Sequence, residues 1–146
     1  MTKNCIVTVR GEQNYPDGVQ DNEPIELITT GYYEMIDGRH TLAYDEVFED
    51  AAGVTSNRID CVPGSAHVVK NGQINVDMLF EPGKSNLACY TTPFGHIDMA
   101  FTASSVECEK TDEAFSLKIV YTMAVEGRYA ADCVLELTAK FRPKKK

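Results

Sequence analysis

The stretch PGSAHVVKNGQINVDMLFEPGKSNLACYTTPFG, residues 63–95, decides the fold class of this chain. Its glycines stand at positions 64, 72, 83 and 95, so the intervals between them are 8, 11 and 12 residues. Each belongs to a sequence typical of a tight turn: Pro63-Gly64, Asn71-Gly72, Pro82-Gly83 and Pro93-Phe94-Gly95. Between the turns apolar and polar residues alternate, as they do in a strand with one buried face. Short strands separated by such turns are typical of an all-β sandwich or barrel.

The same alternation continues on both sides of this stretch and predicts ten strands. They are expected at residues 5–10, 25–36, 39–48, 54–62, 67–70, 73–81, 84–92, 96–106, 115–125 and 128–141, with an acidic break at 107–113. Asp37-Gly38 and Asn71-Gly72 predict two-residue hairpins, and Gly31 inside its strand predicts a β-bulge. Short connections make consecutive strands antiparallel neighbours, and closure of the sheet removes exposed edges. We therefore predict a closed antiparallel up-and-down barrel of about 8–10 strands, with a two-sheet sandwich as the alternative.

Composition indicates one globular domain spanning residues 1–146, because 43% of the residues are hydrophobic and 25% are charged. The net charge is −8, but the last seven residues, 140–146, hold five of the 14 basic side chains. The rest of the chain has 9 basic and 22 acidic side chains, a net charge of −13. Such a body repels phosphate backbones, so we expect no nucleic-acid binding by the barrel. The basic tail 140–146 is interpreted as a solvated terminus, with contact to RNA or an acidic partner as the alternative.

The chain lacks the sequence features of a secreted or membrane-spanning protein. Its start carries no signal-peptide pattern, and no apolar segment approaches the ~18 residues that span a bilayer. The five cysteines are dispersed without a Cys-x-x-Cys pair, which fits reduced thiols in the cytoplasm. The three histidines show no ligand spacing, and Gly83-Lys84-Ser85 lacks the earlier glycine of a phosphate-binding loop. We expect a cytoplasmic protein with no metal and no cofactor.

Several short motifs resemble a known family in their order and spacing. They are Gly31-Tyr32-Tyr33, Tyr44-Asp45-Glu46, Leu79-Phe80 before Pro82-Gly83, the run Tyr90-Thr91-Thr92-Pro93-Phe94-Gly95, and Tyr121. Over residues 5–140 the chain resembles the YwiB-like family of uncharacterised bacterial proteins. The resemblance implies a calycin-like (lipocalin-type) barrel and no assigned activity. The chain contains no tryptophan, so the Gly-x-Trp signature of typical lipocalins is absent and no lipocalin ligand is implied.

Glu46 is the polar residue that most invites a functional interpretation. It shares the apolar face of its strand with His40, Leu42 and Tyr44, so that it is expected to face the interior. A buried carboxylate needs a hydrogen-bond or charge partner, and Arg58 or Ser56 on the next strand is expected within reach. Glu46 then either orients a ligand or acts in acid–base chemistry, or it belongs to a structural pair that sets strand register. The structural interpretation is favoured, because ion-pair networks are common without any function.

The sequence predicts noncovalent binding of a small, partly apolar molecule inside the barrel, since barrel mouths are frequent ligand sites. The residues expected to line that site are Tyr44, Glu46, Arg58, Tyr90 and Tyr121. One alternative is an enzyme that uses Glu46 as an acid or base. Another is an interaction module or homodimer without ligand, which would use the turn residue Phe94.

Overall fold

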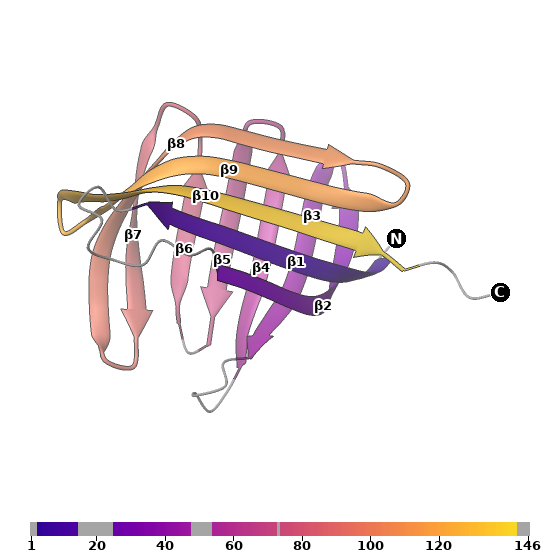
Figure 1. Ribbon diagram of the computed structural model, residues 1–146, viewed down its shortest axis with the longest axis horizontal. Helices are drawn as coiled ribbons and strands as arrows, with labels where there is room; N and C mark the ends of the chain where they lie inside the picture. Colours follow the sequence, from indigo (N-terminus) through magenta and orange to yellow (C-terminus); the bar gives the residue numbers. More distant parts are fainter. Residues whose placement is uncertain (1–2, 15–24, 48–53, 73, 143–146) are drawn as a thin grey trace.

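The structure is a computed structural model that describes residues 3–14, 25–47, 54–72 and 74–142. Ten strands enclose a common interior (Figure 1). They are β1 (Lys3–Asn14), β2 (Ile25–Ile36), β3 (Arg39–Val47), β4 (Val54–Val62), β5 (Ser65–Asn71), β6 (Val76–Phe80), β7 (Ser85–Thr92), β8 (Gly95–Lys110), β9 (Ala114–Val125) and β10 (Arg128–Phe141). The described residues contain no helix long and apolar enough to cross a membrane.

All ten strands form one antiparallel sheet in the order β6-β5-β4-β3-β2-β1-β10-β9-β8-β7. Strands β1 and β10 pair along their length, so the first and the last strand lie side by side in the sheet (Figure 1). The edge strands β6 and β7 meet at a seam, where Asn75 and Thr91 exchange two backbone hydrogen bonds of 2.9 Å. The Asn86 amide also donates to the Leu79 carbonyl across this seam, at 2.9 Å. The up-and-down barrel predicted from the sequence is confirmed, and the sheet is nearly closed.

Two tight turns show why the chain reverses where it does. Asp37 and Gly38, between β2 and β3, have φ angles of 51° and 79°, as the predicted type I′ hairpin requires. Glu126 and Gly127, between β9 and β10, repeat this conformation with φ angles of 51° and 81°. The prediction of a second two-residue hairpin at Asn71-Gly72 is wrong. Strand β6 begins only at Val76, and the connection is held by two hydrogen bonds between the Asn75 side chain and the Gly72 backbone.

The prediction of a bulge at Gly31 is also wrong. The register of β2 with β1 runs through Gly31 without a shift, and the pairing of β2 with β3 extends from Gly31 to Ile36 without a shift. A Cβ at this position would lie 2.5 Å from the Ala43 carbonyl oxygen and 3.0 Å from Val7 Cγ2, so only glycine fits between the packed strands. Bulges occur instead in β8 between Ala103 and Ser105 and in β10 next to Ala131.

Two strands extend beyond their predicted limits because their polar residues point into solvent. Strand β1 continues to Asn14, and β8 continues to Lys110 through the first residues of the predicted acidic break. Glu107 and Glu109 are exposed on the outer face there. The predicted basic tail 140–146 begins inside β10, because Lys140 and Phe141 pair with Ile6 and Cys5. Phe48, Gln73 and residues 143–146 lie outside the described residues.

The inner faces of the strands form one continuous hydrophobic core. Its largest fully buried side chains include Tyr33, Leu42, Ile59, Phe80, Phe115, Leu117, Ile119 and Leu137. Burial of each such side chain stabilises the fold by about 1.5–3 kcal/mol relative to exposure. The barrel is therefore filled over much of its length by its own side chains, as small barrels commonly are.

Candidate functional site

A group of polar side chains interrupts the apolar interior near one end of β3. Alternation along the strands turns Glu46 and Tyr44 of β3, Asn57 of β4, Lys70 of β5 and Tyr90 of β7 away from the outer face. These five residues are referred to below as the polar cluster. Their strands are neighbours in the sheet or face each other across the seam, which places the five side chains at one end of the interior.

The centre of the polar cluster is an ion pair between Glu46 and Lys70. Lys70 Nζ donates to Glu46 Oε1 at 2.6 Å and to Asn57 Oδ1 at 2.7 Å. The side chains of Glu46 and Lys70 are 16% and 22% exposed. Asn57 is fully buried, and its amide nitrogen donates to the Thr55 carbonyl at 3.3 Å. Burial of these groups is tolerated because each charge and amide dipole has a partner.

Two tyrosine hydroxyls complete the polar cluster. Tyr44 is 6% exposed, and Tyr90 is half-buried. Burial, and then the negative charge of Glu46, raises the pKa of both hydroxyls, so that both stay protonated and able to donate. Among the described residues, neither the Tyr44 nor the Tyr90 hydroxyl has a hydrogen-bond partner. Both hydroxyls reach solvent, since among the described residues only Arg10 Nε is a buried side-chain nitrogen or oxygen without a partner.

Three of the predicted site residues thus come together, but Arg58 does not join them. Its side chain lies on the outer face of β4, is 65% exposed, and pairs with Asp60 at 3.3 Å. The expected pairing of Arg58 with Glu46 is wrong, because residues 55 and 57 of β4 face inward and residue 58 therefore faces outward. The partner of Glu46 is Lys70, one strand further along the sheet.

The other two predicted residues lie apart from the polar cluster in different surroundings. Tyr121 packs against Phe80 and Phe101 with ring centroids 4.9 and 5.7 Å away. Burial raises the pKa of Tyr121. Phe94 stands at the turn between β7 and β8 and is 99% exposed, so it does not line the interior.

The opposite end of β3 is closed by stacked rings. The Tyr33 hydroxyl lies 2.6 Å from His40 Nδ1, and Phe115 stacks on His40 with ring centroids 4.9 Å apart. Phe141 packs against Tyr33, with Lys3 Nζ 4.7 Å above its ring. Burial raises the pKa of Tyr33 to about 12, so its hydroxyl donates to His40. The polar groups at this end hydrogen-bond one another, so we take the polar cluster at the other end as the candidate site.

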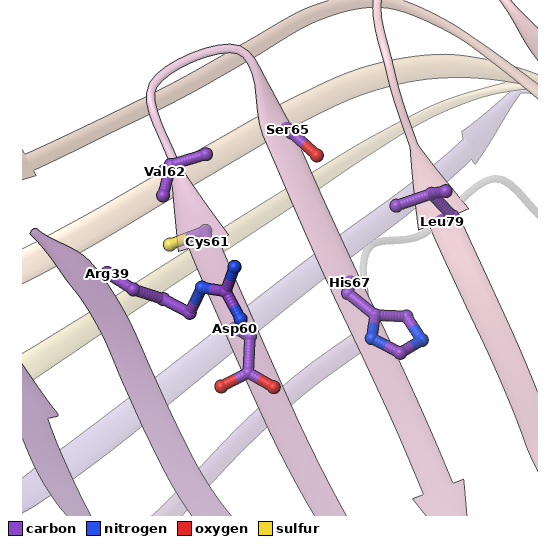
Figure 2. Close-up of a pocket in the computed structure, with 7 residues that line it drawn as sticks. All are labelled: Arg39, Asp60, Cys61, Val62, Ser65, His67 and Leu79. Carbon is purple, nitrogen blue, oxygen red and sulfur yellow. The ribbon is translucent and has the colours of Figure 1, made fainter. Parts of the chain in front are cut away.

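The outer face carries shallow hollows with a different chemistry. One of about 240 Å³ lies over β3 to β6, with Arg39, Asp60, Ser65 and His67 around it (Figure 2). His67 pairs with Asp77, which would suit a serine hydrolase if Ser65 joined them. Figure 2 shows Ser65 and His67 apart along β5, and among the described residues no hydrogen bond joins them. No described group of three or more His, Cys, Asp or Glu side chains is arranged to hold a metal ion.

Sequence reasoning missed Lys70 and Asn57, although each left a signal. Lys70 continues the alternation of the buried residues Ala66 and Val68, and Asn57 lies between the buried Thr55 and Ile59. A charged or amide side chain at the buried period of a strand predicts an internal partner. Glu46 supplies that partner, because the long lysine side chain reaches across β4.

Comparison with known proteins agrees with this architecture. The family described as Domain of unknown function (DUF1934) matches residues 7–137. The "Uncharacterized beta-barrel protein YwiB" of Bacillus subtilis (strain 168) is 28% identical over 109 residues, which cover 75% of this chain and 74% of that protein. The crystal structure of the ywiB protein from Bacillus subtilis matches with a TM-score of 0.83 and 20% identity over 97% of this chain and 94% of that chain. The chain therefore belongs to the DUF1934 family, and its fold is that of the YwiB barrel.

Proposed function

We propose that this barrel noncovalently binds a small, partly apolar molecule at the end of its interior that holds the polar cluster. The polar part of such a molecule would contact Tyr44, Tyr90 and the Glu46–Lys70 pair. Its apolar part would lie toward Leu42 and Val68, the buried residues that precede Tyr44 and Lys70 on the inner faces of β3 and β5. A few polar groups that converge at the edge of an apolar interior are typical of sites for small molecules.

The observation that carries the proposal is the Tyr44 hydroxyl. The Tyr44 side chain is only 6% exposed, its hydroxyl stays protonated, and among the described residues that hydroxyl has no hydrogen-bond partner. The hydroxyl is not fully enclosed, because among the described residues only Arg10 Nε is a buried side-chain nitrogen or oxygen without a partner. A protonated hydroxyl that is free of partners in the chain and still reaches solvent can donate a hydrogen bond to a bound acceptor.

Binding is favoured over acid–base catalysis by the state of Glu46. Its carboxylate is held by Lys70, and Lys70 is itself fixed by Asn57, so a proton transfer by Glu46 would have to break this network. Static, mutually neutralised charges suit the orientation of a ligand. The interaction-module alternative uses other residues, since Phe94 lies outside the barrel.

Native mass spectrometry of the full chain, purified gently from its own cells, tests the proposal. The wild type is compared with Tyr44→Phe, which removes only the hydroxyl, and with Tyr32→Phe on the exposed outer face as the matched control. We expect a bound small molecule in the wild type and the control. Its occupancy should imply an affinity on the order of tenfold lower in Tyr44→Phe, about 1.4 kcal/mol. Equal occupancy in all three proteins, or no bound molecule in any, would overturn the proposal.

A further inference from the structure

The seam between β6 and β7 is the weakest junction in the wall of the barrel. The two strands follow each other in the chain and are connected by residues 81–84. All other neighbouring strands of the described sheet are joined by continuous ladders of residue pairs. Along the seam, the structure describes one isolated pair, Asn75 with Thr91, which exchanges two backbone hydrogen bonds of 2.9 Å.

Continuation of this pairing toward the turn would add further hydrogen-bonded pairs, which the strands do not form. In an antiparallel ladder such pairs recur at every second residue, so Asp77 would bond Cys89. Leu79 would bond Leu87 in the same way. Among the described residues no backbone hydrogen bond joins either pair. The Leu79 carbonyl instead accepts the side-chain amide of Asn86, so β6 and β7 remain unpaired between the isolated pair and the turn.

The isolated pair borders the polar cluster. Because Asn75 lies opposite Thr91, Val76 lies opposite Tyr90. On its other side Val76 pairs with Lys70, in the register of β6 with β5. A row of inner-face residues therefore crosses the seam, and Lys70 and Tyr90 of the polar cluster stand at its two ends. Separation of β6 from β7 at this point would open the polar cluster to solvent through the side of the barrel.

The turn at the other end of the seam is anchored and can serve as a hinge. The Gly83 amide donates to the Ala103 carbonyl of β8, and the Lys84 amide donates to the Glu81 carbonyl, each at 3.0 Å. Gly83 has a φ angle of 81°, which a glycine adopts without strain. These contacts keep the turn in place on β8 when the end of the seam at the isolated pair separates.

We propose that the seam is a gate through which a small, partly apolar molecule enters the polar cluster. This inference rests on the proposed function and adds the route of entry to it. Opening breaks the two backbone hydrogen bonds between Asn75 and Thr91, and Tyr90 then moves with β7 away from Lys70. The ladders of β6 with β5 and of β7 with β8 stay intact. Such local opening needs less free energy than unfolding of the whole barrel.

Hydrogen exchange of the full chain, followed by NMR, tests whether the gate opens. The amides of Asn75 and Thr91 are bonded across the seam, whereas the amide of Leu135 lies in the middle of β10 between two ladders. We expect the first two amides to exchange on the order of 100-fold faster than that of Leu135. Exchange of all three at one rate would overturn the proposal, because the seam would then open only with the rest of the barrel.

A disulfide across the isolated pair tests whether the gate admits a molecule. The variant combines Asn75→Cys with Thr91→Cys, because the Cα atoms of a hydrogen-bonded pair are about 5.5 Å apart and a disulfide spans that separation. Cys89→Ser is added to remove the exposed neighbouring thiol. The same protein is compared in its oxidised and reduced forms, so that only the cross-link differs. The probe is 1-aminoanthracene, a neutral aromatic amine whose fluorescence rises in apolar surroundings.

We expect the oxidised form to take up the probe at least about tenfold more slowly than the reduced form in stopped-flow mixing. Equal rates of uptake would overturn the gate and leave the proposed function in place. If the wild type also took up none of the probe, the proposed function would be overturned together with the gate. If the variant does not fold, hydrogen exchange of the wild type decides whether the seam opens.

Discussion

Replacement of Lys70 by methionine is predicted to destabilise the barrel far more than loss of an ion pair on its outer surface. The substitution keeps the length of the apolar stem but leaves the Glu46 carboxylate in the interior without its cation. Removal of one partner from a fully buried pair costs about 3–5 kcal/mol, and from an exposed pair at most about 1 kcal/mol. Because the side chains of Glu46 and Lys70 are only 16% and 22% exposed, we expect Lys70→Met to lower the free energy of unfolding by about 2–3 kcal/mol.

The matched control is Arg58→Met, which breaks the outward-facing pair with Asp60. Because Arg58 is 65% exposed, this change should cost within about 0.5 kcal/mol. The assay is equilibrium urea unfolding followed by circular dichroism. With a slope of about 2 kcal/mol per molar, Lys70→Met should lower the midpoint by about 1–1.5 M, and Arg58→Met by at most about 0.3 M.

A double-mutant cycle separates the ion pair from the packing of the lysine stem. The double variant Lys70→Met with Glu46→Gln leaves neither charge unpaired, so it should be more stable than Lys70→Met alone by about 1 kcal/mol or more. If Lys70→Met and Arg58→Met lowered the free energy of unfolding by equal and small amounts, Glu46 would lie in a solvent-like environment and the interpretation as a buried pair would be wrong.

Three further outcomes follow from the described contacts. Gly31→Ala should lower the free energy of unfolding by about 1–3 kcal/mol, because its Cβ would clash with a backbone oxygen of β3. Gly11→Ala is the control, since its Cβ would enter open space and should leave the stability nearly unchanged. Thermal unfolding of the two variants tests this difference. Burial, and then a nearby lysine, lowers the pKa of His40 from its ordinary value of 6.5, so the unfolded chain binds the proton more readily. Stability should therefore fall as the pH drops below about 6.5, and His40→Gln should flatten this part of the pH profile; an unchanged profile would contradict the assignment. Phe115→Ala should cost about 3–5 kcal/mol and Phe94→Ala within about 0.5 kcal/mol in denaturant unfolding, because one ring is buried and the other exposed; similar losses would contradict these positions.

The wall of the barrel could be predicted from the sequence because its causes are local. Alternation with a period of two marks the inner face of each strand, and Asp37-Gly38 specifies a hairpin through its backbone angles. The inward positions of Tyr44 and Glu46 followed from the same alternation. No long-range information was needed for these features.

The contacts inside the barrel could not be predicted, because they depend on register across several strands. The pairing of Glu46 with Lys70 depends on the relative positions of β3, β4 and β5, whereas the sequence alone favoured Arg58 on the neighbouring strand. The inward position of Val106 depends on the bulge in β8, which nothing in its local sequence marks as clearly as a glycine would. The glycine at position 31 is visible in the sequence, but the reason for it is not, because that reason is the close approach of neighbouring strands.

The most direct test of the binding site is a high-resolution crystal structure of the full chain purified from its own cells. We expect ordered density that does not belong to the chain, within hydrogen-bonding distance of the Tyr44 hydroxyl and beside Lys70 and Tyr90. A Tyr44 hydroxyl that is hydrogen-bonded to a group of the chain itself, at an end of the interior filled by side chains, would contradict the proposed binding site.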